Sequence, residues 1–101
     1  MKNLIIVTGG AGFIGSNLIS HLLKKTKKKI ISVDNYSTGS KRNHLKDKRV
    51  RYIAGNTSDI KNILSHYIKN IHSIFHFGEF SRIFLIFIVS HLIYLTFLFL
   101  I

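Results

Sequence analysis

The sequence carries near its start the stretch Thr8-Gly9-Gly10-Ala11-Gly12-Phe13-Ile14-Gly15. An apolar run typical of a buried strand precedes it, and a helical pattern of apolar residues follows it. Gly9 lets the chain turn sharply off the strand, Gly12 lets the backbone approach a phosphate, and Gly15 lets the helix pack close to the sheet. The helix would direct its unpaired N–H groups and the positive end of its dipole at an anion. The stretch therefore predicts a strand–turn–helix unit that holds the pyrophosphate of a dinucleotide.

An acidic residue supports this interpretation. Asp34 closes the next apolar run, residues 30–33, at a distance of about 20 residues from the last glycine. A carboxylate at that position of a dinucleotide site meets the ribose hydroxyls. Two simpler interpretations stay open, an ordinary turn for the glycines and a strand-end turn residue for Asp34. The strand, the glycine spacing and the acid together favour the dinucleotide site.

The pattern of apolar residues predicts an α/β fold. We expect strands near residues 3–8, 29–34, 50–54 and 73–77, and helices near residues 13–25 and 59–69. This is the N-terminal half of a Rossmann-type doubly wound parallel sheet. Ser58 is predicted to cap the second helix, whose apolar residues are predicted to pack in the core. Half a sheet would leave the strand at 73–77 with an unpaired edge.

Four motifs, taken together and in order, resemble those of a known family. They are residues 7–18, which include the glycine stretch, then residues 33–39, residues 55–57 and residues 75–82. On these motifs the chain resembles the extended short-chain dehydrogenases, and among them the NAD-dependent sugar-nucleotide epimerases and dehydratases of the UDP-glucose 4-epimerase type. The resemblance covers roughly residues 2–82.

The resemblance implies NAD as the cofactor and assigns its contacts. It places the pyrophosphate at Gly9, Gly12, Phe13, Ile14 and Gly15, the adenosine ribose at Asp34 and Asn35, the adenine at Asn56 and Thr57, and the inner cofactor pocket at Phe77 and Gly78. Family members usually carry Asp where Asn56 stands, and Asn keeps the hydrogen-bonding shape without the charge. They often carry Ala-Ala or Ala-Gly at the positions of Gly78 and Glu79. Lys41 or Arg42 could reach the extra phosphate of NADP, but Asp34 would repel it, so NAD is favoured.

The residues that perform the family's chemistry are missing from the sequence. In the family a Tyr-x-x-x-Lys pair transfers the proton. The residues four positions after the four tyrosines are here Ser40, Asn56, Ile71 and Leu98. Without a positioned base, general acid–base catalysis is lost, so no catalytic residue is assigned. We therefore expect a truncated, catalytically incompetent version of an enzyme whose substrate is a nucleotide sugar.

An apolar tail without formal charge, residues 83–101, begins where the resemblance ends. As a helix it would be roughly 28 Å long, close to the thickness of a bilayer's hydrocarbon core. Three interpretations are open: the product of a frameshift or similar lesion, a membrane anchor, and a buried core segment. The first is favoured because the break falls inside a motif and no linker separates the two parts. The predicted regions are a partial NAD-binding domain, 1–82, and the tail; the alternative function is a membrane-tethered nucleotide-binding or interaction module.

The formal net charge of +11 raises the question of a nucleic-acid partner. The first basic cluster, residues 24–29, ends a predicted helix, where cations complement the dipole, and no aromatic residues are interleaved with it. No specific nucleic-acid partner is therefore predicted. No metal site is predicted either, because cysteine is absent and the six histidines show no ligand spacing. The lack of cysteine and of an N-terminal signal peptide favours the cytoplasm, with membrane association through the tail as the alternative.

Overall fold

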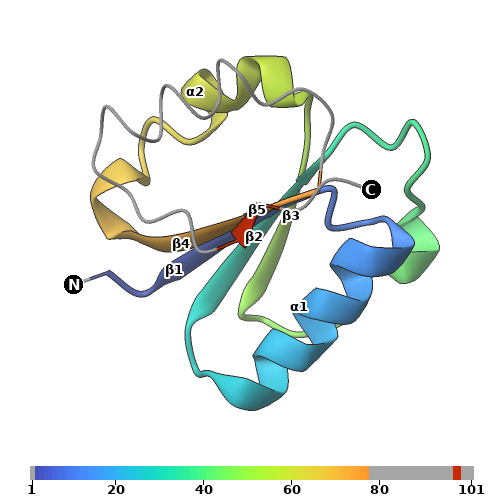
Figure 1. The fold of residues 1–101 in the computed structure, drawn as a ribbon, viewed down its shortest axis with the longest axis horizontal. Helices are drawn as coiled ribbons and strands as arrows, with labels where there is room; N and C mark the ends of the chain where they lie inside the picture. The colour runs from blue at the N-terminus through green and yellow to red at the C-terminus, as the bar shows by residue number, and fades with distance from the viewer. Residues whose placement is uncertain (1, 78–96, 99–101) are drawn as a thin grey trace.

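The computed structural model describes residues 2–77 and 97–98. Its centre is a parallel sheet with the strand order β3-β2-β1-β4-β5 (Figure 1). The strands are β1 (Leu4–Thr8), β2 (Lys29–Asp34), β3 (Val50–Ala54), β4 (Ile71–His76) and β5 (Phe97–Leu98). The classic doubly wound sheet has the same order for its first five strands. The predicted fold class, an α/β fold with a Rossmann-type parallel sheet, is confirmed.

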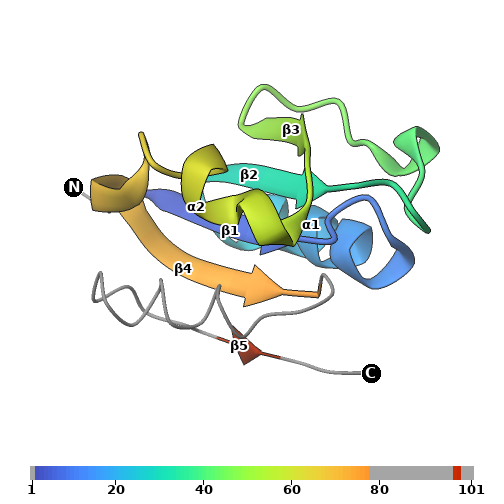
Figure 2. The same ribbon diagram turned by 90° about the horizontal axis from the view of Figure 1, so that it is seen from above.

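Helical segments cover both faces of the sheet, as Figures 1 and 2 show. Helix α1 (Phe13–Lys25) covers one face, where its Ile19 belongs to a buried cluster with Ile5, Val7 and Ile30. The short helix α2 (Ile60–Ile63) lies on the other face. The buried cluster on that side consists of Leu4, Ile6, Ile31, Val33, Ile60, Leu64, Ile71 and Ile74. Successive residues of β1 enter opposite clusters, which explains why its first four residues are an uninterrupted apolar run.

The second helix is much shorter than the sequence predicted. Only Ile60–Ile63 is α-helical, between two 3₁₀ turns, η2 (Thr57–Asp59) and η3 (Ile68–Asn70). After Leu64 the chain continues in turns, in which the N–H of Tyr67 donates to the carbonyl of Leu64 at 2.9 Å. The helix predicted for residues 59–69 is therefore wrong in its length.

The predicted cap of this helix is also wrong, but the predicted packing is confirmed. Ser58 lies inside η2, and the residue before α2 is Asp59, whose side chain makes no capping hydrogen bond. The apolar residues at the predicted helical spacing nevertheless all face the core. Of these, Ile60, Leu64 and Ile71 are buried, and Ile63, Tyr67 and Ile68 pack against the cluster. Apolar residues three or four positions apart can share one side of a turn as well as one side of a helix.

Strand β4 contains a β-bulge opposite β1. Consecutive residues of β1 pair with Ile71 and then with Ser73, so His72 is an extra residue in β4. His72 is exposed, whereas the residues on both sides of it are buried. The bulge allows Ile71 and Ile74, three positions apart, to enter the same buried cluster.

The edge of β4 is paired where the sequence predicted an open edge. Strand β5 runs parallel to β4, with Phe97 opposite Phe75 and Leu98 opposite His76. The prediction of an unpaired edge is therefore wrong at the carboxyl end of β4. Both residues of β5 belong to the apolar tail.

Most of the tail lies outside the described residues. Its interpretations as a lesion product, a membrane anchor or a core segment therefore stay predictions. Among the helices within residues 2–77 and 97–98, none has the length and apolar character needed to span a membrane.

Candidate cofactor-binding site

The turn between β1 and α1 requires glycine at two of the predicted positions. Gly9 has a φ of 73°, a conformation that side chains rarely allow, and its N–H donates to the carbonyl of Val33 at 2.8 Å. At Gly15 an added Cβ would lie 2.2 Å from the carbonyl oxygen of Gly9. The first turn of α1 therefore packs directly on the glycine turn, as the spacing of the two residues predicted.

Gly12 is different, because the fold itself leaves room for a side chain there. An added Cβ would meet only the carbonyl oxygen of Gly9, at 3.4 Å, which is an ordinary contact. Gly12 is the N-cap of α1, with a φ of −81° and no side-chain cap. The space in front of it is open to a ligand.

The N-terminus of α1 has the properties of an anion site. The first-turn N–H groups of a helix have no acceptor within the helix, and no acidic residue lies in this first turn. Phe13 and Ile14 have exposed fractions of 81% and 42%, unusual values for large apolar side chains. The first turn therefore presents N–H donors and uncovered apolar surface side by side.

The carboxylate of Asp34 is fixed beside the glycine turn. Its Oδ2 accepts the N–H of Ala11 at 2.9 Å, and its Oδ1 accepts the N–H of Tyr36 at 2.8 Å. Each carboxylate oxygen keeps a further lone pair for a ligand hydroxyl. Burial raises the pKa of Tyr36, and the nearby Asp34 and Tyr52 raise it further. The structure thus brings together the glycine turn and the acid that the sequence predicted.

Two predicted residues from neighbouring strand ends contact each other. Asn35 accepts the N–H of Ser37 through Oδ1 at 2.9 Å and donates through Nδ2 to Oδ1 of Asn56, also at 2.9 Å. Asn56 therefore accepts a hydrogen bond from the Asn35 amide, and an Asp at this position could accept the same bond. Thr57 follows at the start of η2.

Phe77 also reaches the glycine turn, at the end of β4. Its N–H donates to the carbonyl of Thr8 at 3.1 Å and to the Thr8 hydroxyl at 3.0 Å. An added Cβ on Gly9 would lie 3.1 Å from the carbonyl carbon of Phe77. The next residue of the predicted pocket, Gly78, lies outside the described residues.

His76 is a buried residue of the sheet. Its Nδ1 lies 2.5 Å from the hydroxyl oxygen of Thr8. Burial lowers the pKa of His76 and so favours the neutral imidazole.

Sequence reasoning missed a second set of contacts to the glycine turn. The Ser40 N–H and the Asn43 Nδ2 both donate to the carbonyl oxygen of Ala11, at 3.0 and 2.7 Å. No local pattern signals these bonds, because Asn43 is 32 residues from Ala11. Gly10 was also missed; an added Cβ there would overlap the side chain of Ser32.

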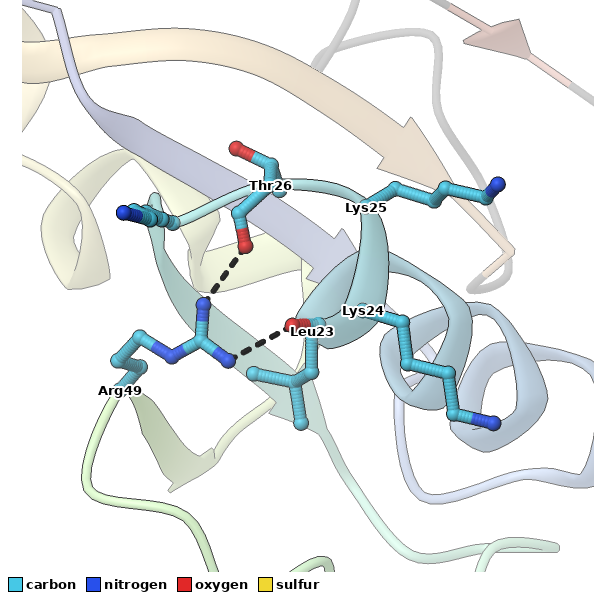
Figure 3. Close-up of a pocket in the computed structure, with 6 residues that line it drawn as sticks. Leu23, Lys24, Lys25, Thr26 and Arg49 are labelled. Carbon is cyan, nitrogen blue, oxygen red and sulfur yellow. Dashed lines mark hydrogen bonds between the residues drawn. The ribbon is translucent and has the colours of Figure 1, made fainter.

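A hollow of about 590 Å³ lies at the opposite end of α1, away from the glycine turn. It is lined by Leu23, Lys24, Lys25, Thr26, Lys27 and Arg49. Figure 3 shows that the Arg49 guanidinium points at the end of the helix. It donates to the carbonyls of Thr26 at 2.7 Å and Leu23 at 2.8 Å. Arg49 is thus a helix cap, and the hollow is a feature of the α1 terminus.

Within residues 2–77 and 97–98, no three His, Asp or Glu side chains are grouped to hold a metal.

Comparison with known proteins finds segments similar to this chain in several enzymes. UDP-glucuronic acid decarboxylase 6 of Arabidopsis thaliana is 59% identical over 39 residues, which are 39% of this chain and 11% of that protein. The crystal structure of dTDP-glucose 4,6-dehydratase of Bacillus anthracis with NAD is 32% identical with a TM-score of 0.68, over 77% of this chain and 27% of that one. UDP-glucose 4-epimerase of Thermotoga maritima with UDP-glucose is 31% identical with a TM-score of 0.64, over 74% and 24%.

These matches cover only a small part of each relative, about a tenth of the decarboxylase and a quarter of the two solved enzymes. The match to a protein family covers a larger part of this chain than the 39 residues matched by the decarboxylase. The model of the family described as "NAD dependent epimerase/dehydratase family" matches residues 5–84, which include β1 from its second residue, the glycine turn, Asp34 and β4. This agrees with the resemblance seen in the four motifs. The chain belongs to the NAD dependent epimerase/dehydratase family.

Proposed function

We propose that residues 1–82 bind NAD, with the pyrophosphate at the glycine turn and the adenosine ribose at Asp34. One observation carries the proposal: the Ala11 N–H of the glycine turn donates to Oδ2 of Asp34 at 2.9 Å. This bond brings a helix N-terminus suited to phosphates next to a carboxylate suited to ribose hydroxyls. Phe13 and Ile14 would then be covered by the bound cofactor.

The remaining predicted contacts are part of the same proposal. Asn35 would join Asp34 at the ribose, and Asn56 and Thr57 would lie beside the adenine. Phe77 and Gly78 would line the inner pocket. The proposal is supported for Asn35, Asn56 and Phe77 by their positions at the carboxyl ends of the strands, where parallel α/β sheets bind ligands.

The first experiment is a calorimetric titration of the full chain with NAD and with NADP. We expect NAD to bind more tightly, because the Asp34 carboxylate would repel the additional phosphate of NADP. Asp34→Asn should reduce that preference. Asp59→Asn is the matched control. Asp59 lies in η2, and its carboxylate accepts a hydrogen bond from the Asn62 side chain and none from the glycine turn among the described residues. The absence of NAD binding, or equal affinity for both cofactors, would overturn the proposal.

We further propose that these residues hold the cofactor of an enzyme that acts on a nucleotide sugar, and that they do not perform the chemistry themselves. The printed sequence contains no Tyr-x-x-x-Lys pair, and the similar epimerase was solved with UDP-glucose. NAD supplies hydride transfer in such enzymes. Because the sequence contains no such pair, mixing the chain with NAD and UDP-glucose should give no NADH fluorescence. Formation of NADH would contradict this part of the proposal.

A further inference from the structure

The backbone of Ala11 is held on both sides by residues of one segment, which runs from the end of β2 through the loop that follows it. Its N–H donates to Asp34, and its carbonyl accepts the Ser40 N–H at 3.0 Å and the Asn43 amide at 2.7 Å. Ala11 is fully buried. Gly39 makes the close approach possible, because an added Cβ there would lie 3.0 Å from the carbonyl carbon of Ala11.

Asn43 is itself held by the segment around it. It ends the 3₁₀ turn η1 (Lys41–Asn43), which Ser40 caps by accepting the N–H of Arg42 at 3.1 Å. The next residue, His44, stacks on Tyr52 of β3 with ring centroids 3.8 Å apart. The loop is thus attached to the sheet at a second point, His44, next to the contact between Asn43 and Ala11. This attachment restricts the position of the Asn43 backbone and so of its side-chain amide.

We propose that Asn43 is a positioning residue of the cofactor site, which acts by fixing the peptide unit between Ala11 and Gly12. The peptide is planar, so a fixed Ala11 carbonyl also fixes the direction of the Gly12 N–H, which donates to Gly9 at 3.1 Å. Gly12 is the N-cap of α1. The Asn43 amide therefore sets the entry of the chain into the helix turn that faces the pyrophosphate. The inference rests on the proposed binding of NAD at this turn.

Two substitutions test the role. Asn43→Asp keeps the shape of the side chain but replaces the N–H donor by an oxygen that faces the Ala11 carbonyl. Asn43→Ala removes the side chain altogether. Each should raise the dissociation constant for NAD by about three- to tenfold, the usual range for a lost hydrogen bond. The matched control is Asn70→Ala, because Asn70 is an exposed residue of η3 at the other end of β4; it should leave the constant unchanged.

Amide hydrogen exchange separates positioning from general destabilisation. In both Asn43 variants the amides of Ala11 and Gly12 should exchange faster, while those in the centre of β1 exchange as in the wild type. Unchanged exchange at Ala11 and Gly12, or uniformly faster exchange throughout the sheet, would overturn the inference. So would faster local exchange with an unchanged NAD affinity. If the wild-type chain does not bind NAD, the proposed function fails, and hydrogen exchange alone decides whether Asn43 orders the turn.

Discussion

The side chain of Ser32 occupies the space that a side chain on Gly10 would need. An ideal Cβ on Gly10 would lie 2.0 Å from Oγ of Ser32 and 2.7 Å from its Cβ. Both residues are buried, one in the glycine turn and the other in the middle of β2. The packing of a neighbouring strand therefore requires the second glycine of the turn.

Gly10→Ala should destabilise the fold, and a second substitution should partly restore it. Overpacking of this kind costs about 1–3 kcal/mol, measurable as a lower midpoint of urea unfolding. Adding Ser32→Gly removes both close atoms, so the double variant should be more stable than the sum of the two single effects. Strict additivity of the two substitutions would show that the overlap is relieved in some other way.

Gly12→Ala and Gly15→Ala should separate binding from stability. At Gly15 the new Cβ would lie 2.2 Å from a backbone oxygen, so this variant should lose stability by several kcal/mol. At Gly12 the contact is ordinary, and the cost should stay near the ~1 kcal/mol of a less favourable N-cap. NAD affinity should nevertheless fall strongly in Gly12→Ala, because the methyl group faces the proposed pyrophosphate. Tight NAD binding by this variant would contradict that placement.

Arg49→Lys should weaken the end of α1. The planar guanidinium of Arg49 donates to two carbonyls, those of Leu23 and Thr26, and an ammonium group lacks this fork. We expect a loss of about 1–3 kcal/mol in the free energy of unfolding, measured by chemical denaturation. Arg42→Lys is the control, because Arg42 is exposed in η1. Equal stability of the two variants would rule out the cap.

The stability of the fold should decrease in mild acid because of His76. Burial lowers the pKa of this imidazole below its ordinary 6.5, so the unfolded chain takes up the proton first as the pH falls. The contribution is therefore complete above about pH 6.5 and is lost as the pH falls from there toward the lower, folded-state pKa. Urea unfolding between pH 7.5 and about 5 should show this decrease in the wild type and a smaller one in His76→Asn. The same slope in both proteins would assign the effect to other groups.

The sequence predicted the parts of the site that depend on local chain geometry. A left-handed turn at Gly9 and a close helix approach at Gly15 require glycine wherever they occur, so spacing alone identified them. The position of Asp34 at the end of β2 followed from the apolar run before it. The assigned roles of these residues in NAD binding stay predictions that the experiments above address.

The sequence could not predict contacts made by ordinary residues across long chain separations. The bond from Asn43 to Ala11 depends on how a loop folds back over the glycine turn, and no spacing rule describes it. The length of α2 was mispredicted because the apolar spacing from Ile60 to Ile71 fits a helix and a series of tight turns equally well. The pairing of β5 with β4 was missed because no pattern in an apolar tail indicates the strand with which it pairs.

The bulge at His72 determines which single-residue deletions β4 can tolerate. Side chains alternate along a strand, so the loss of one residue normally moves all those beyond it to the wrong face. Removal of His72 would instead leave Ile71 followed directly by Ser73, the succession in which these residues already pair with β1. A single-codon deletion at this position would thus keep the other side chains of β4 on their present faces of the sheet, whereas the same deletion at Ile74 would move Phe75 and His76 to the opposite face.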